Sequence, residues 1–195
     1  AHAAWPLRIL LFGFAALALY TNGRPDAGWA YLDGTADLTF LESRGYMGEL
    51  FSGDRLRSID AAVPHQLFAT TGFVSTLMRG LVGLSVKRAE MRGGQPLPDR
   101  LVLAPQLPAG WGYLRVRNVR WRGVTADIEV SRDEFGISVS VAPRWGTLPL
   151  EFQASFPPGA ATVKARTSKG WNPLGADAAA PRGPRMWRFD EIFRP

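Results

Sequence analysis

The chain has 195 residues, of which 46% are hydrophobic and 21% charged, an ordinary composition for a globular protein of one or two small domains. It contains no cysteine, which excludes disulfides and thiolate metal sites. The two histidines, His2 and His65, are too few for a histidine-rich metal site, and no phosphate-binding or cofactor motif occurs, so we expect no metal and no cofactor.

The first predicted element is Ala3–Tyr20, the most apolar run in the chain. Arg8 interrupts it, and its length falls short of the roughly 20 apolar residues that a membrane span needs. Thr21–Pro25 then reads as a helix stop and turn rather than a signal cleavage site. Because a helix that is apolar on all sides is typical of a buried helix, we predict one here. A signal or membrane anchor is the alternative.

Two further helices are predicted from apolar residues spaced three or four positions apart. Pro25–Phe40 begins with a proline and an acid, which suit the first turn of a helix. Pro64–Leu84 has its apolar residues at positions 67, 68, 74, 77, 78, 81 and 84. Both patterns indicate core packing rather than a cofactor site.

Between these helices lies a glycine-rich loop, Arg44–Asp54, with a single glutamate at its centre. Glu49 stands among apolar and aromatic residues that include Tyr46 and Phe51. In a cleft such a carboxylate has a raised pKa and can transfer protons near neutral pH, while the aromatic rings suit sugar binding. An ordinary loop glutamate facing solvent is the alternative, and on these residues alone it is the better interpretation.

After a polar linker at Lys87–Arg100 the apolar period changes from helical to two. In Val124–Val130 the apolar residues alternate strictly with polar ones, as in a half-buried strand. The other predicted strands are Leu101–Leu103, Gly112–Val119, Gly136–Val141, Leu148–Ser155 and Ala161–Arg166. This spacing favours an antiparallel β-sandwich.

The end of the chain, Gly170–Pro195, is rich in Pro, Gly, Ala and Arg and is predicted as an extended tail. Its apolar residues Met186–Phe189 and Ile192–Phe193 should dock on another part of the protein. The net charge of +6 raises the possibility of a nucleic acid partner. However, the arginines are not clustered, so we expect a solvated face with an acidic ligand as the alternative; they stand at 115, 117, 120, 122 and 132.

Four short motifs resemble one enzyme family. Gly48–Gly53 resembles the PELFSG signature of bacterial amylo-alpha-1,6-glucosidases of the glycogen-debranching type, with glycine in place of the proline. Pro64–Phe68 is similar to the PQAW-like start of the last barrel helix of that family, and Trp5–Arg8 to a WPHD start whose His and Asp are lost. Leu103–Pro108, followed by Trp111, resembles the opening of the small β-domain behind the barrel.

The resemblance implies an α+β chain in which the last helices of an (α/α)6 toroid precede a small antiparallel β-sandwich domain. The implied parts are barrel helices over 1–86, a linker over 87–100, the β-sandwich over 101–170 and the tail over 171–195. The expected function is the C-terminal portion or subunit of an inverting glycoside hydrolase that acts on α-linked glycosides. A non-catalytic carbohydrate-binding or structural module is the alternative.

In the resembled family the loop glutamate is the general base, which places Glu49 in that role, with Tyr46, Phe51, His65 and Gln66 near the sugar. The general acid is an aspartate on an earlier part of the barrel that these 195 residues do not contain. We therefore expect a second polypeptide that carries the rest of the barrel, a carbohydrate substrate, and no nucleic acid or membrane partner. The chain alone should be inactive, and its compartment is left open with the cytoplasm favoured.

Overall fold

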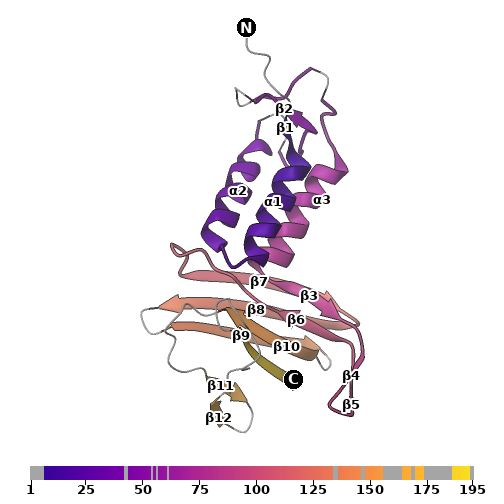
Figure 1. The fold of residues 1–195 in the computed structure, drawn as a ribbon, viewed down its shortest axis with the longest axis vertical. Helices are drawn as coiled ribbons and strands as arrows, with labels where there is room; N and C mark the ends of the chain where they lie inside the picture. The colour runs from indigo at the N-terminus through magenta and orange to yellow at the C-terminus, as the bar shows by residue number, and fades with distance from the viewer. Residues whose placement is uncertain are drawn as a thin grey trace. The chain divides into compact units, whose positions relative to one another are not determined.

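The computed structural model describes residues 7–41, 44–53, 55, 57–60, 62–133, 136–145, 148–155, 164–167, 170–173 and 186–193. The chain divides into two compact units, Ala1–Leu81 and Val82–Pro195 (Figure 1). The described parts of the first unit are mainly helical, and those of the second are strands. The α+β class expected from the change of apolar period is therefore confirmed, whereas a toroid is not shown.

The described residues of the helical unit form three α-helices that pack against one another (Figure 1). Its elements are β1 (Leu7–Arg8), α1 (Ile9–Thr21), α2 (Pro25–Leu38), β2 (Leu50–Phe51), α3 (Leu67–Thr76) and the π-helical turn η1 (Leu77–Leu81). The short strands β1 and β2 pair antiparallel, so the start of α1 is tied to the loop that carries Glu49. Among the described residues, no helix is both long enough and apolar enough to span a membrane.

Helices α1 and α3 approach each other at a pair of glycines. A Cβ atom on Gly13 would lie 2.7 Å from the carbonyl carbon of Gly72, so only glycine fits at this crossing. The buried Thr76 hydroxyl donates a hydrogen bond to the Gly13 carbonyl oxygen at 2.8 Å. The close backbone contact is therefore reinforced by a buried polar one.

Tyr20 packs at the end of α1 between two other glycines. A Cβ atom on Gly28 would lie 2.8 Å from the Tyr20 ring, and one on Gly80 would lie 2.6 Å from it. The side chain is 1% exposed, and its hydroxyl has no hydrogen-bond partner among the described residues. Burial, followed by the charge of Asp26, raises the pKa of Tyr20.

The third helix is shorter than the predicted Pro64–Leu84. It begins at Leu67 because Gln66 is extended, with its backbone N–H donating to the Met47 carbonyl at 2.8 Å. It ends before Gly83, whose φ of +72° belongs to the left-handed region and whose missing Cβ makes room for the Ala104 carbonyl. The predicted first helix likewise begins only at Ile9, since Leu7–Arg8 is a strand, and residues 3–6 lie outside the described ranges.

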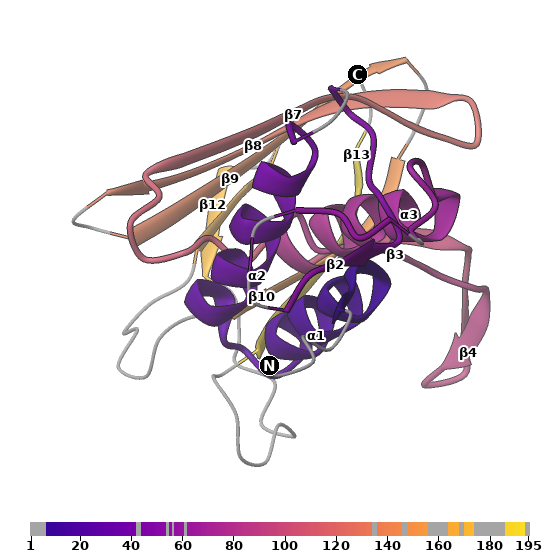
Figure 2. The same cartoon turned by 90° about the horizontal axis from the view of Figure 1, so that it is seen from above.

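The described residues of the second unit form two larger sheets and two short hairpins (Figures 1 and 2). One sheet has the order β13-β10-β6-β3, formed by β3 (Leu84–Lys87), β6 (Arg100–Leu103), β10 (Leu148–Ser155) and β13 (Met186–Phe193). The other consists of β7 (Tyr113–Trp121), β8 (Val124–Asp133) and β9 (Gly136–Trp145). The hairpins are β4 (Glu90–Arg92) with β5 (Gln95–Leu97) and β11 (Lys164–Thr167) with β12 (Gly170–Pro173).

Both larger sheets bury apolar side chains, at alternate positions on β8 and at consecutive positions on β6, where Leu101, Val102 and Leu103 are all buried. On β8 the buried residues are Val124, Ala126, Ile128 and Val130, as the sequence alternation predicts. On the other sheet they include Leu101, Leu103, Leu148 and Leu150. Two sheets that each bury apolar side chains are consistent with a β-sandwich. The expectation of purely antiparallel pairing is corrected in one place, because β6 and β10 pair parallel.

Two segments predicted without strands contain them. The polar linker 87–100 includes the β4–β5 hairpin, whose turn has φ values of 57° at Gly93 and 80° at Gly94, the geometry of a type I′ turn. In the predicted tail, β13 pairs antiparallel with β10 from Met186 to Phe193. Residues 174–185 of the tail lie outside the described ranges.

Candidate functional site

The segment around Glu49 is held by backbone hydrogen bonds to the residues just before α3. The Glu49 N–H donates to the Val63 carbonyl at 3.0 Å, and the Gln66 N–H donates to the Met47 carbonyl at 2.8 Å. The side chain of Glu49 is half-buried. The structure thus brings Glu49 next to the Val63–Gln66 segment, as the predicted site requires, although these two stretches are separated in the sequence by a loop.

Tyr46 and His65 lie against each other in the same cluster. Their ring centroids are 4.3 Å apart and the rings meet edge to face at 70°. Both side chains are exposed, that of Tyr46 by 47%. Gly45 has a φ of +81°, and its N–H donates to the Thr39 carbonyl at 3.1 Å, which turns the chain from the end of α2 toward Tyr46.

Phe51 points away from this exposed surface. Its side chain is 4% exposed and belongs to the core of the helical unit, together with Leu38, Met47 and Ala69. A ring in this position packs the loop onto the helices, whereas the sequence placed Phe51 near the sugar.

The other carboxylates of the loop do not complete a catalytic pair in the described residues. Asp60 is exposed, and Asp54 lies outside the described ranges. Among the described residues, no group of three or more His, Asp or Glu side chains is placed to hold a metal ion. The candidate site therefore consists of Glu49, Tyr46, His65 and Gln66.

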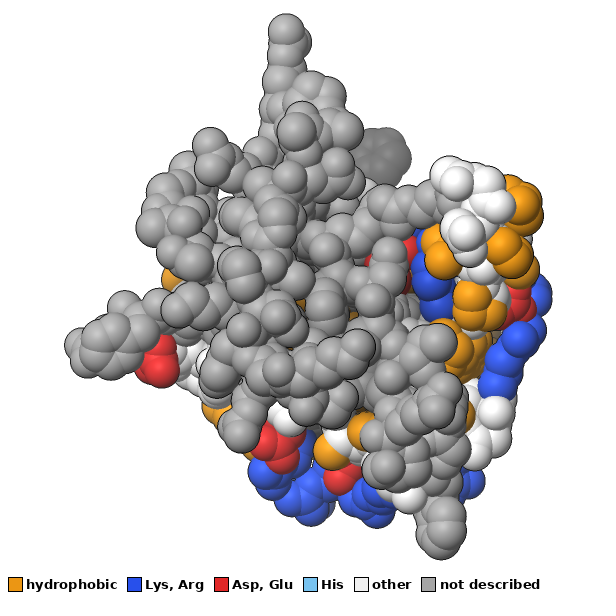
Figure 3. Space-filling model, turned by 90° about the horizontal axis from the view of Figure 1, so that it is seen from below, with side chains coloured by type: hydrophobic (Ala, Val, Ile, Leu, Met, Phe, Trp, Pro, Cys, Tyr) orange, Lys and Arg blue, Asp and Glu red, His pale blue; other side chains and the backbone are white. Residues whose placement is uncertain are grey.

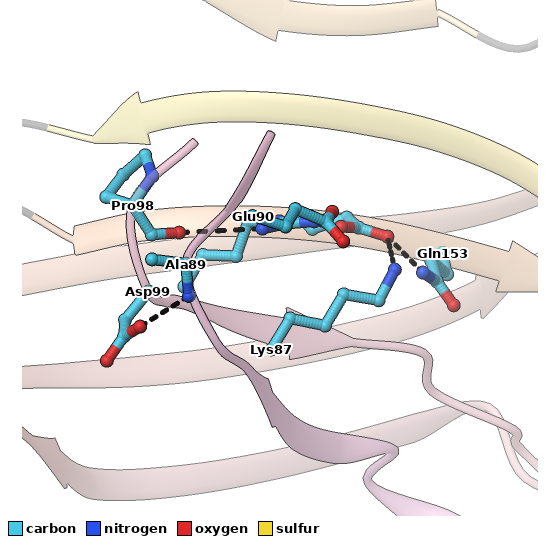
Figure 4. Close-up of polar contacts among 8 residues, drawn as sticks. Lys87, Ala89, Glu90, Pro98, Asp99 and Gln153 are labelled. Carbon is cyan, nitrogen blue, oxygen red and sulfur yellow. Dashed lines mark hydrogen bonds and ion pairs between the residues drawn. The ribbon is translucent and has the colours of Figure 1, made fainter. Parts of the chain in front are cut away.

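The β unit contains a buried carboxylate that sequence analysis missed. Glu151 is 0% exposed on β10 and accepts hydrogen bonds from Lys87 Nζ at 2.5 Å and Arg100 Nε at 2.7 Å. Gln153 also donates to Glu151, and Arg100 pairs with Glu90 (Figure 4). Lys87 lies opposite Arg100 in the antiparallel register of β3 and β6, so two basic side chains reach Glu151 from neighbouring strands.

Burial alone would raise the pKa of Glu151, but the hydrogen bonds from Lys87, Arg100 and Gln153 outweigh it and lower the pKa to about 2. Glu151 is therefore a permanently charged structural group at neutral pH. The carboxyl that Glu49 would need as its counterpart is a general acid, which must carry a proton near neutral pH, and a carboxylate held in its charged form by these hydrogen bonds does not suit that role.

The basic residues of the β unit are interleaved with acids. Arg115 pairs with Glu129, and Arg144 Nη2 lies 2.5 Å from Asp127 Oδ2. Asp127 also accepts from the Asn118 N–H at 2.9 Å, at a bulge of β7. Figure 3 shows Lys and Arg side chains beside Asp and Glu on the face that it draws. Four of the five arginines expected on a solvated face are exposed, namely Arg115, Arg117, Arg120 and Arg122. Arg132 is half-buried and donates to the carbonyl oxygens of Pro108 and Leu107.

Comparison with known proteins identifies part of the β unit. Residues 96–153, from β5 to β10, match the family described as Glycosyl hydrolase family 65, C-terminal domain. None of the curated proteins compared with the chain matches it. The match confirms a glycoside hydrolase-related C-terminal domain, and it does not point specifically to the glycogen-debranching type.

Proposed function

We propose that the chain is the C-terminal portion or a subunit of an inverting glycoside hydrolase that acts on α-linked glycosides, with Glu49 as the general base. The observation that carries the proposal is the match of residues 96–153 to a glycosidase C-terminal domain. The helical unit directly before this domain holds a glutamate loop that resembles a glycosidase signature. Position and motif therefore support the same class of enzyme.

The proposed chemistry needs two carboxyl groups on opposite sides of the scissile bond. In an inverting enzyme they stand about 6.5–9.5 Å apart, which leaves room for a water molecule between the base and the sugar. Glu49 would accept a proton from that water, and the hydrogen bond of its N–H to Val63 would keep its backbone in place. His65 and Gln66 would reach sugar hydroxyls.

The general acid would come from a second polypeptide that carries the remaining hairpins of an (α/α)6 barrel. The proposed assembly is supported by apolar side chains on α1 and α3 that remain exposed to solvent. Leu11 is 59% exposed, Phe14 is 57% exposed and Val74 is 48% exposed. Burying side chains of this kind contributes about 1.5–3 kcal/mol each. An interface with further helices would provide that burial.

The assembly prediction is tested by analytical ultracentrifugation of the purified chain, alone and with any polypeptide that co-purifies from its native source. We expect a stable complex, because Leu11, Phe14 and Val74 need a partner surface. A well-folded lone monomer of 21.4 kDa that binds no second chain would contradict the proposed assembly.

The activity is tested on the same complex with α-linked disaccharides of different linkage. NMR spectra recorded during the first turnovers should show the β-anomer of the released sugar, the product expected from inversion of an α-linkage. Formation of the α-anomer would contradict the inverting mechanism. Absence of hydrolysis by a complex that binds sugar would instead support a non-catalytic carbohydrate-binding module.

A further inference from the structure

The charged residues of the chain are distributed unevenly between its two units. Residues 1–81 carry 6 of the 23 basic residues and 7 of the 17 acidic ones, whereas residues 82–195 carry the remaining 17 basic and 10 acidic residues. The helical unit is therefore slightly acidic and the β unit strongly basic. An asymmetry of this kind indicates a charged binding partner.

Arginines gather on the outer face of the sheet formed by β7, β8 and β9. On β7, Arg115 and Arg120 lie opposite Glu129 and Thr125, which alternate with the buried residues of β8. Arg117 is exposed two residues after Arg115, so it lies on the same side of the strand. The three arginines of β7 therefore share the face of the sheet that points away from the buried side of β8.

The carboxylates on this outer face do not neutralise all of its arginines. Arg144 of β9 pairs with Asp127, whose pKa is lowered by hydrogen bonds from the Asn118 N–H and Arg144 and by the charge of Arg117. Within the described parts of the chain, no ion pair is formed by Arg117 or Arg120. Two positive charges on the face are thus left without a carboxylate partner among the described residues. We define the arginine face as Arg115, Arg117, Arg120 and Arg144.

An acidic stripe lies on α2 and consists of Asp26, Asp33 and Asp37. All three residues are exposed, and at 3.6 residues per turn their spacing places them within about 40° of one another around the helix axis. The buried residues of α2 lie on the opposite side of the helix. Among the described residues, Asp33 and Asp37 form no ion pair. The stripe therefore offers carboxylates to a partner.

The acidic stripe and the arginines of β7 have similar spacings. With a rise of about 1.5 Å per residue, the two intervals between the carboxylates along the helix axis are about 6 and 10 Å. With a rise of about 3.3 Å per residue, the two intervals between the three arginines along the strand are about 7 and 10 Å. Each carboxylate can therefore meet one guanidinium when α2 of one molecule lies along β7 of another.

We propose that the arginine face of one copy of the chain binds the acidic stripe of a second copy. Carboxylates suit arginine, because the planar guanidinium can donate two parallel hydrogen bonds to them. A nucleic acid fits this face less well, since Asp127 and Glu129 lie among the arginines and would repel a continuous run of phosphates. The contact uses neither the apolar side chains of α1 and α3 nor Glu49, so it does not depend on the proposed function.

The test is sedimentation equilibrium of the full chain over a range of concentrations, at about 0.01 M and about 1 M salt, where the Debye length is about 30 Å and about 3 Å. We expect self-association at the lower salt concentration that weakens about tenfold or more at the higher one. Arg117→Glu combined with Arg120→Glu should raise the dissociation constant about tenfold or more, because like charges then face one another. Asp33→Arg combined with Asp37→Arg should have the same effect. An equimolar mixture of the two double variants should associate as the wild type does, because the charges are again complementary.

The matched control is Arg44→Glu combined with Arg57→Glu, which makes the same change of net charge at two exposed loop residues of the helical unit. It should leave the dissociation constant unchanged within about twofold. Circular dichroism checks the fold of each variant. If the glutamate variant of β7 does not fold, Arg117→Gln combined with Arg120→Gln takes its place and should weaken association by a smaller factor.

The proposal is overturned if the chain remains monomeric at the lower salt concentration, or if the control weakens association as much as the β7 variant. Failure of the mixture to associate would also overturn it. Association that persists at the higher salt concentration and in both double variants would instead come from the apolar surface of α1 and α3. A monomeric chain that binds duplex DNA through Arg117 and Arg120 would replace the second copy by a nucleic acid.

Discussion

The two units of the chain place their carboxylates in opposite settings. In the helical unit Glu49 is half-buried in a loop beside exposed aromatic side chains. In the β unit Glu151 is fully buried and is held in its charged form by Lys87 and Arg100. The family match falls on the β unit, whereas the candidate chemistry lies in the helical unit. The part of the chain that the family match covers is thus not the part expected to perform the reaction.

The largest expected effect on stability comes from removing Arg100. Arg100→Met would leave Glu151 buried with fewer partners, and breaking a buried ion pair in this way costs about 3–5 kcal/mol. Arg115→Met is the matched control, because Arg115 pairs with Glu129 where both side chains are well exposed, and such pairs contribute about 0–1 kcal/mol. Urea unfolding, monitored by circular dichroism, measures the free energy of unfolding of both variants. Equal losses would show that the Glu151 network does not stabilise the β unit.

The next largest expected effect is the pH dependence of the stability of the β unit. The pKa of Glu151 is about 2 in the folded chain and 4.5 in the unfolded one, so the carboxylate contributes stability above pH 4.5 that is lost as the pH falls from 4.5 to 2. The loss should be about 3 kcal/mol at most. Thermal melts between pH 7 and pH 2 should show this decline, and Glu151→Gln should flatten it. An unchanged slope in that variant would contradict the assignment.

A smaller effect is expected at the crossing of α1 and α3. Gly13→Ala would place a Cβ atom 2.7 Å from the Gly72 backbone, and overpacking of this kind costs about 1–3 kcal/mol. Gly34→Ala on α2 is the control, because no atom lies within 4 Å of the added Cβ, and alanine should stabilise the helix by about 0.5–1 kcal/mol. Opposite signs of the two changes in the free energy of unfolding are the expected result.

Sequence reasoning was most successful where a single period governs a segment. The strict alternation of Val124–Val130 predicted β8, and the spacing after Pro25 predicted α2. It was less successful where hydrogen bonds to residues distant in the sequence determine the backbone conformation. Helix α3 starts late because Gln66 bonds to Met47, and no local pattern reveals this. Phe51 was expected at the sugar because the loop sequence does not show which side chains of β2 face the core.

The buried network of Glu151 was also beyond the reach of local patterns. Its members come from β3, β6 and β10, and only the parallel pairing of β6 with β10 brings Arg100 near Glu151. By contrast, the cluster of Glu49 with His65 and Gln66 was predicted from a motif and from the start of the next helix. The structure places these residues side by side, while their role in catalysis remains a prediction.

The most direct test of the account is the effect of Glu49→Gln on hydrolysis by the complex of the chain with its barrel partner. Loss of the proton acceptor removes an interaction needed in the transition state and little packing, so turnover should fall by several orders of magnitude while fold and assembly are retained. Asp60→Asn, which neutralises an exposed carboxylate of the same loop region, is the control and should retain wild-type turnover. Unchanged turnover by the Glu49→Gln complex on a substrate that the wild type cleaves would contradict the account.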